Sequence, residues 1–186
     1  MKKFLKIIAL SIASILGLLI LIVVVTLLTM SVKGSRSARK SLALAGSEVK
    51  TVTAGGFLFR DLNKNGSLDP YEDSRLPASE RVNDILSQMT LEEKAGMMFV
   101  SMISMRIDGS VSEKPSLNDP FSFAVPGTSN MIFSKHINHF NILAGTGKKE
   151  MAMWHNNIQK LAERTRLGIP VVIATDPRNQ FSNNPL

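Results

Sequence analysis

One uncharged segment near the start of the chain constrains its fold more than any other feature. From Ile7 to Met30 the sequence runs for 24 residues without a charged side chain. A helix rises about 1.5 Å per residue, so a helix of this length exceeds the roughly 30 Å hydrocarbon layer of a membrane. The segment therefore predicts a single membrane-spanning helix, and residues 1–30 form a membrane anchor with a short basic tail at the N-terminus.

Two other interpretations of this segment stay open, a cleaved signal peptide and a buried core helix. The apolar part of a signal peptide is usually about 7–15 residues long, and small residues at the cleavage site follow it directly. The only Ala-x-Ala pattern after the segment is Ala43-Leu44-Ala45, well beyond its apolar end. The length and the position of this pattern favour an uncleaved anchor.

The basic excess of the chain lies on the two flanks of the apolar segment. The net charge is +7, and residues 51–186 hold 14 basic and 14 acidic side chains, so the whole excess belongs to residues 1–50. Nucleic-acid binding needs positive charge clustered on the folded part, so we expect no nucleic-acid partner. Because basic residues stand on both sides of the span, charge alone does not orient it in the membrane.

After the span the sequence changes to a polar linker and then to alternating helices and strands. Residues 31–56 are rich in Ser, Ala, Gly and basic side chains and predict the linker, with a short strand at 51–53. Helices are predicted to begin near Pro77 and at Thr90, where Glu93 completes a capping box, and a third is expected over 151–165. Buried strands are predicted at 97–103 and 171–174 and a further strand at 137–143, with a long loop over 104–134. This order predicts a parallel sheet of an α/β fold.

A twelve-residue segment, 61–72, has the oxygen-donor spacing of a calcium-binding loop. Gly66 stands where such loops make their sharp turn, and calcium prefers six to eight oxygen ligands. The candidate metal ligands are Asp61, Asn63, Asn65, Ser67 (through its carbonyl), Asp69 and Glu72. The alternative is an Asn-Gly turn whose side chains cap the local backbone, because no helix is predicted to enter the segment and no second copy pairs with it.

Asp176 follows the last predicted strand, at the edge of the sheet where α/β folds place ligand-contacting groups. A turn or helix N-cap role is equally compatible with the local pattern, because Pro177 comes next. The three histidines, His136, His139 and His155, predict no zinc site, since no third ligand has suitable spacing. The chain has no Cys, which excludes disulfides and thiolate metal sites.

Several stretches resemble the N-terminal part of glycoside hydrolase family 3, the β-glucosidase-like enzymes. The matching stretches are FRDLNKNGSLDPYED (59–73), RLPASERVNDILSQMTLEEKAGMMF (75–99), INHFNIL (137–143) and WHNNIQKLAERTRLGIPVVIATDPR (154–178). The resemblance covers residues 57–186 and implies a (β/α)8-type barrel followed by an α/β sandwich domain. It also implies a retaining mechanism with an Asp nucleophile and a second acid, and such carboxyl groups stand about 5–5.5 Å apart.

The resemblance assigns Asp176 and Arg178 to substrate binding, with Asp176 holding sugar hydroxyls. Asn179 departs from the family, because a His is common at that position. The nucleophile and the acid/base have no matching position, so no catalytic residue is assigned and no cofactor is expected for catalysis. We therefore expect an α/β chain in which a transmembrane helix precedes the first portion of a barrel, truncated, with residues 57–186 as a partial catalytic domain.

The resulting expectation is a single-pass membrane glycosidase for terminal β-linked sugars, whose soluble part is extracytoplasmic and which is inactive as these 186 residues alone. Its expected partners are a carbohydrate substrate and, through residues 7–30, the membrane. One alternative is a non-catalytic, calcium-dependent binding module at the cell surface. Another is a small membrane protein whose truncated domain has no remaining role.

Overall fold

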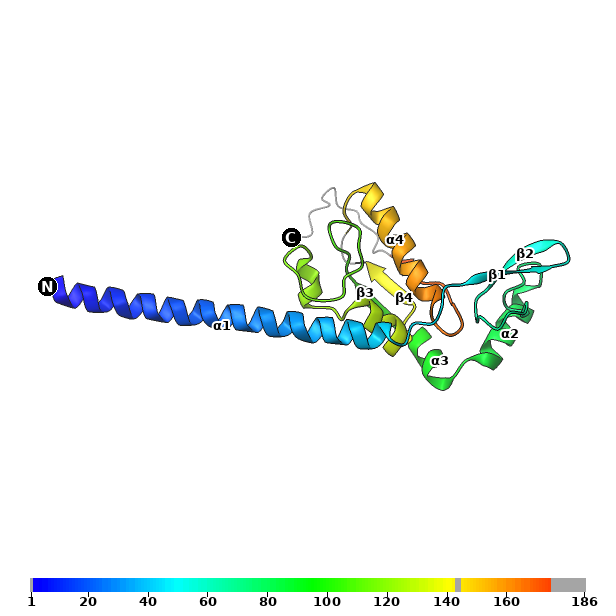
Figure 1. Ribbon diagram of the computed structural model, residues 1–186, viewed down its shortest axis with the longest axis horizontal. Coiled ribbons are helices and arrows are strands. Elements are labelled where there is room, and N and C mark those ends of the chain that lie inside the picture. The colour runs from blue at the N-terminus through cyan, green and yellow to red at the C-terminus, as the bar shows by residue number, and fades with distance from the viewer. Residues whose placement is uncertain (1, 143–144, 175–186) are drawn as a thin grey trace.

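The computed structural model describes residues 2–142 and 145–174, which form a long helix attached to a mixed helix and sheet body (Figure 1). The helices are α1 (Lys2–Leu42), α2 (Ala78–Gln88), α3 (Leu91–Met97) and α4 (Lys148–Glu163), with a 3-10 turn η1 (Pro120–Phe123) and a π turn η2 (Asn130–Ser134). The strands are β1 (Lys50–Ala54), β2 (Phe57–Asp61), β3 (Val100–Ile103), β4 (His139–Ile142) and β5 (Val172–Ala174).

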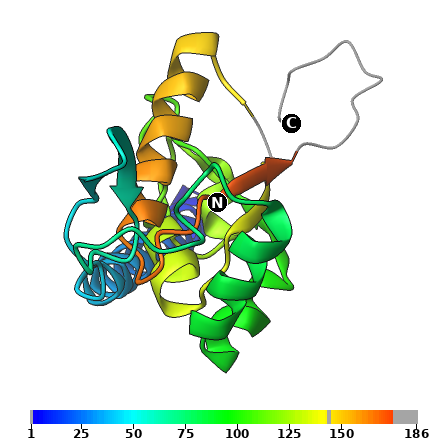
Figure 2. The ribbon, with the colours of Figure 1, turned by 90° about the vertical axis from the view of Figure 1, so that its right-hand side faces the viewer.

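Helix α1 is continuous over 41 residues, so residues 31–42, the first part of the predicted linker, are helical. By length and composition α1 is able to cross a membrane, although a signal sequence passes the same test. The window that qualifies is not buried at all, so the core-helix interpretation is wrong. The helix continues past Met30 because Ala, Arg and Lys are good helix formers and because Ala38 and Ser41 are buried against the body. Figure 2 shows α1 nearly end-on behind that body.

The short strand predicted at 51–53 is confirmed as part of β1, which pairs with β2 in an antiparallel hairpin. Lys50 is paired with Asp61 at the open end of the hairpin, and Ala54 is paired with Phe57 next to the turn. The turn consists of Gly55 and Gly56, whose φ angles are 59° and 80°. A two-residue hairpin turn of this hand needs positive φ, which glycine adopts without steric cost. Strand β2 then leads directly into the 61–72 loop, so an extended segment enters that loop, as predicted.

The helix starts predicted near Pro77 and at Thr90 are confirmed, whereas the helix predicted from residue 151 begins at Lys148. Pro77 is the N-cap of α2. The capping box of α3 is complete, because the Thr90 hydroxyl accepts from the Glu93 N–H and the Glu93 carboxylate accepts from the Thr90 N–H. Helix α4 ends at Glu163, and Gly168 adopts a φ of 60° before the chain enters β5.

The predicted parallel sheet is confirmed, with strand order β3-β4-β5. Its covered face packs against α4 and η2, where Phe140, Trp154 and Ile158 are nearly inaccessible to solvent. The strand predicted as buried over 97–103 begins only at Val100 and is largely exposed, because the described residues cover one face of the sheet. These three strands do not form a closed barrel.

Candidate functional site

The predicted sugar-binding residues Asp176 and Arg178, and Asn179 beside them, lie outside the described residues. Their assignment therefore stays a prediction. The structure does describe β5, which ends at Ala174, and the carboxyl ends of β3 and β4 beside it. This edge of the parallel sheet is where the family resemblance expects sugar to bind.

A buried carboxylate, Asp119, lies in the loop that follows β3 and was not singled out by the sequence. Its side chain is 3% exposed, and Oδ2 accepts hydrogen bonds from Ser104 Oγ at 2.8 Å and from Ser112 Oγ. Both hydroxyls belong to the same loop, so Asp119 holds the predicted 104–134 loop closed next to the end of β3. Its environment of donors indicates a structural role.

Glu113 is a second, partly buried acid of this loop. Burial raises the pKa of its carboxyl group, against the opposing effect of the hydrogen bonds donated by Ser129. These bonds come from the Ser129 N–H, at 3.1 and 3.2 Å to the two carboxylate oxygens, and from its hydroxyl at 2.5 Å. Glu113 therefore fixes the start of the η2 region, and neither it nor Asp119 is assigned to catalysis.

The face of the parallel sheet away from α4 is open. The strand register places Val100, His139 and Val172 side by side, with Met102, Asn141 and Ala174 forming the next row toward the carboxyl ends. Val100, Met102 and Val172 are 68%, 54% and 51% exposed, although all three are apolar. His139 Nδ1 is buried and has no hydrogen-bond partner among the described residues. This face has the composition of a packing surface.

The 61–72 loop brings all six predicted metal ligands into one compact turn. Asp61 accepts the N–H groups of Asn65 and Gly66, both at 3.0 Å, and Gly66 has a φ of 81°. Glu72 accepts from Leu62 N at 2.6 Å and Asn63 N at 3.2 Å through Oε1. The carboxylates therefore cap the loop's own backbone, as the turn interpretation expects.

The remaining candidate ligands also pair within the loop. Asp69 Oδ2 accepts from the side-chain amides of Asn63 at 2.5 Å and Asn65 at 2.6 Å. Asn65 Oδ1 accepts from the Ser67 N–H at 2.7 Å. Among the described residues no group of three or more His, Cys, Asp or Glu side chains could hold a metal ion. The predicted calcium ligands are thus close together, but their acidic groups do not converge as they would around an ion.

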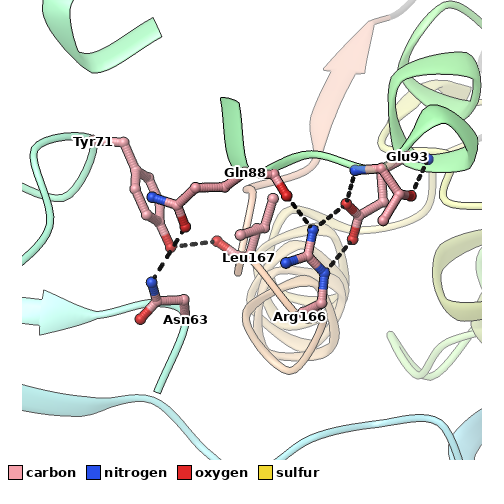
Figure 3. Close-up of polar contacts among 7 residues, drawn as sticks. Asn63, Tyr71, Gln88, Glu93, Arg166 and Leu167 are labelled. Atoms are coloured by element: carbon pink, nitrogen blue, oxygen red, sulfur yellow. Dashed lines mark hydrogen bonds and ion pairs between the residues drawn. The ribbon is translucent and has the colours of Figure 1, made fainter. Parts of the chain in front are cut away.

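Lys64 and Tyr71 attach this loop to the segment that follows α4. Lys64 Nζ donates to the carbonyls of Glu163 and Thr165 at 2.6 and 2.5 Å, at the C-terminal end of α4. Burial lowers the pKa of Lys64, although Asp61 and other nearby acids oppose the shift. The buried Tyr71 hydroxyl donates to the Leu167 carbonyl at 3.1 Å (Figure 3). The loop is therefore held against the connection that leads from α4 to β5.

An ion pair between Arg166 and Glu93 ties α3 to the same connection. The guanidinium donates to the Glu93 carboxylate at 3.0 and 2.5 Å and to the Gln88 carbonyl at 2.7 Å (Figure 3). Burial raises the pKa of Glu93, but the hydrogen bonds from Arg166 and Thr90 and nearby positive charge outweigh it, so the net pKa is lowered. These contacts could not be predicted from neighbouring residues, because the partners are 73 and 78 residues apart.

A scan against protein-family models found no match. The chain is 44% identical over 133 residues to a periplasmic beta-glucosidase/beta-xylosidase of Dickeya chrysanthemi, covering 71% of this chain and 19% of that protein. It is 43% identical over 122 residues to a probable beta-glucosidase C of Aspergillus oryzae, and 40% identical over 125 residues to a beta-glucosidase C of Emericella nidulans. These matches cover 65% and 67% of this chain and 18% of each relative. The chain spans about a fifth of the length of the curated relatives it matches.

Proposed function

Because this chain is related by sequence to the β-glucosidase-like glycoside hydrolases of family 3, we propose that it forms the first part of a membrane-anchored enzyme that hydrolyses terminal β-linked sugars with retention of configuration. The identity of 40–44% over two-thirds of the chain supports the reaction class. The matching stretches from residue 59 to residue 178 support a position at the start of the catalytic domain.

The open face of the parallel sheet is the observation that carries this proposal. In a (β/α)8 barrel, helices cover the outside of the strands while layers of side chains from neighbouring strands fill the inside. Here α4 and η2 cover one face, and the other presents in-register rows that include the exposed Val100, Met102 and Val172. Such rows are what the first three strands of a barrel present before the remaining strands enclose them.

In the proposed enzyme Asp176 and Arg178 bind the sugar and do not cleave the glycosidic bond. The Asp176 carboxylate accepts hydrogen bonds from sugar hydroxyls, and Arg178 donates to sugar oxygens. Retaining hydrolysis needs two carboxyl groups about 5–5.5 Å apart, one as nucleophile and one as acid/base. Neither has a matching position in these 186 residues, so the proposal assigns both to further polypeptide and expects no turnover from residues 1–186 alone.

A chimera tests the reaction class. In it this chain's matching residues replace the corresponding 133-residue segment of the Dickeya chrysanthemi enzyme. We expect the chimera to hydrolyse aryl β-glucosides. Loss of a hydrogen bond to a charged group costs about 1.5–3 kcal/mol, so Asp176→Asn should lower kcat/KM roughly 10- to 100-fold. Asn179→His, which restores the residue common in the family, is the matched control and should keep activity. Turnover by residues 1–186 alone, or a folded chimera without turnover, would contradict the proposal.

We also propose that α1 stays attached as a single-pass anchor, with the folded body outside the cytoplasm. The apolar length of α1 and its unbroken continuation into the body support an uncleaved helix. Protein extracted from membranes should begin at Met1 or Lys2. A soluble form that begins near Gly46 would instead establish a cleaved signal peptide.

A calcium ion in the 61–72 loop is a separable part of the proposal, with a stabilising and non-catalytic role. The spacing of the oxygen donors and the positive φ of Gly66 support it. The Asp61 and Glu72 carboxylates accept from backbone N–H groups. The Asp69 carboxylate accepts from side-chain amides of the loop, so binding requires the three acids to turn toward a common point. Calcium binding without any turnover from the chimera would favour the alternative function, a calcium-dependent surface binding module.

A further inference from the structure

The last three turns of α1 are fixed to the folded body. Positions with reduced exposure recur at helical spacing on one face, beginning at Met30 and continuing through Gly34 and Ala38 to Ser41. Described residues before Met30 are all exposed. Ser41 Oγ lies 2.9 Å from Ser134 Oγ of η2. A Cβ built at Gly34 would lie 2.7 Å from Lys114 Cβ, so the absence of a side chain there permits the close approach.

This attachment places one loop of the body at the point where α1 would leave the membrane. The uncharged segment ends at Met30, and a surface cavity is lined by Met30 and Lys33 of α1 together with Lys114, Phe123 and Pro126. Figure 1 shows η1 beside α1, on the side of the body that faces the N-terminal half of the helix. One helical turn spans only about 5.4 Å, so the loop lies at the level of the lipid headgroups if α1 crosses the bilayer.

The exposed side chains of this membrane-proximal loop, residues 114–126, suit a lipid interface. Leu117 is 80% exposed and Phe123 is 36% exposed. The other exposed members are apolar, amide or basic: Lys114, Asn118, Pro120, Ala124 and Pro126. Asp119, the only acid of the loop, is buried on Ser104 and Ser112. The preceding Glu113 is held by Ser129.

Basic residues of α1 extend this surface. Lys33 and Arg36 are exposed on the turns next to the loop, and Arg39 and Lys40 follow one turn later. Exposed apolar side chains next to exposed cations, with no exposed acid in the loop, match a surface that binds anionic lipid headgroups and dips into the upper acyl region.

We propose that the membrane-proximal loop is a second membrane-binding element, which rests on anionic phospholipids beside α1 and inserts Leu117 and Phe123 at the headgroup boundary. This inference depends on the proposed anchoring role of α1. Together the docked helix and the loop hold the body in one orientation against the bilayer, so the body does not swing on a flexible tether.

The absence of Cys from the chain allows single labels to test this. We would attach an environment-sensitive fluorophore to Leu117→Cys, to Leu91→Cys and to Leu19→Cys in the full chain, reconstituted in nanodiscs of phosphatidylcholine and phosphatidylglycerol. Leu91 is a matched control, because it is 77% exposed and lies on α3, which Figure 1 places beyond the C-terminal end of α1. The Leu19 label reports whether α1 is embedded.

A lipid with a nitroxide at the headgroup should quench the fluorescence of the Leu117 label at least about twofold more than that of the Leu91 label. A lipid with a nitroxide on its acyl chain should quench the fluorescence of the Leu19 label. Quenching at Leu19 with equal signals at Leu117 and Leu91 would overturn this inference and leave the anchor intact. No quenching at Leu19 would overturn the anchor and the inference together. Discs of phosphatidylcholine alone, or Lys33→Gln with Lys114→Gln, should reduce the Leu117 quenching, and an unchanged signal would refute the role of anionic lipid.

Discussion

Replacing Glu72 by Gln tests how the 61–72 loop is stabilised. The buried carboxylate accepts three backbone N–H groups, from Leu62 at 2.6 Å and Asn63 at 3.2 Å on Oε1 and from Asp69 at 3.1 Å on Oε2. A carboxamide has one oxygen, so its best orientation keeps the first two bonds and turns its NH2 group toward the Asp69 N–H. The variant loses one hydrogen bond to a charged acceptor and leaves a donor unpaired.

Such a loss costs about 1.5–3 kcal/mol, so we expect Glu72→Gln to lower the free energy of unfolding by that amount in the presence of a chelator. Trp154, the only Trp of the chain, is 1% exposed in the core, and its fluorescence reports unfolding by urea in detergent micelles. Glu48→Gln is the control, because Glu48 is exposed and lies outside the helices and strands. If the free energy of unfolding of Glu72→Gln lies within about 0.5 kcal/mol of that of the unchanged protein, the Glu72 carboxylate does not stabilise the loop in this way.

The same pair of proteins tests calcium. A ligand present at 100 times its dissociation constant stabilises the folded state by about 2.7 kcal/mol. We expect calcium to stabilise the unchanged chain and to leave Glu72→Gln unaffected, because position 12 supplies the bidentate ligand of such loops. Identical calcium responses would show that the loop is a capped turn without an ion.

Two further predictions concern α3. Gly96→Ala should lower the free energy of unfolding by about 1–3 kcal/mol in the same urea assay, because the new Cβ would collide with the His136 carbonyl oxygen, a rigid backbone atom. An unchanged urea midpoint would contradict this close approach. The pKa of Glu93 is lowered in the folded state, so its contribution to stability is present above the ordinary carboxyl pKa of about 4.3 and is lost as the pH falls through the lower folded value. Unfolding midpoints measured from about pH 6 to pH 3 should therefore fall less steeply for Arg166→Gln than for the unchanged chain, and equal slopes would contradict the coupling.

Features encoded by neighbouring residues could be predicted from the sequence. The capping box of Thr90 and Glu93 defines the start of α3, since both hydrogen bonds join residues three positions apart. The apolar β-branched run at 171–174 and the strand order likewise predict the parallel sheet correctly. The six candidate calcium ligands are adjacent in space because they are adjacent in the chain, and the backbone capping by Asp61 and Glu72 agrees with the alternative turn interpretation.

Features that depend on distant partners could not be predicted. Residues 31–42 have the composition of a linker, and they stay helical where Ser41 meets Ser134, 93 residues away. In the sequence Lys64 has no feature that distinguishes it from other loop residues. In the structure it donates hydrogen bonds to carbonyl groups at the C-terminal end of α4, about a hundred residues further along the chain. The predicted burial of the strand over 97–103 was wrong for a related reason, because the burial of an apolar strand depends on which segments cover each face of its sheet.

The open face of the sheet also determines how residues 1–186 are expected to behave in isolation. Parallel sheets are almost always covered on both faces, and large exposed apolar patches favour association. Val100 and Met102 project from β3, which is also an edge strand of the described sheet and therefore presents unpaired backbone groups. Residues 1–186 by themselves should consequently self-associate, whereas a chimera that supplies the remaining strands should bury the same side chains. The apolar face expected to cause self-association of residues 1–186 is thus the same face on which, in the proposed enzyme, we expect further strands to pack.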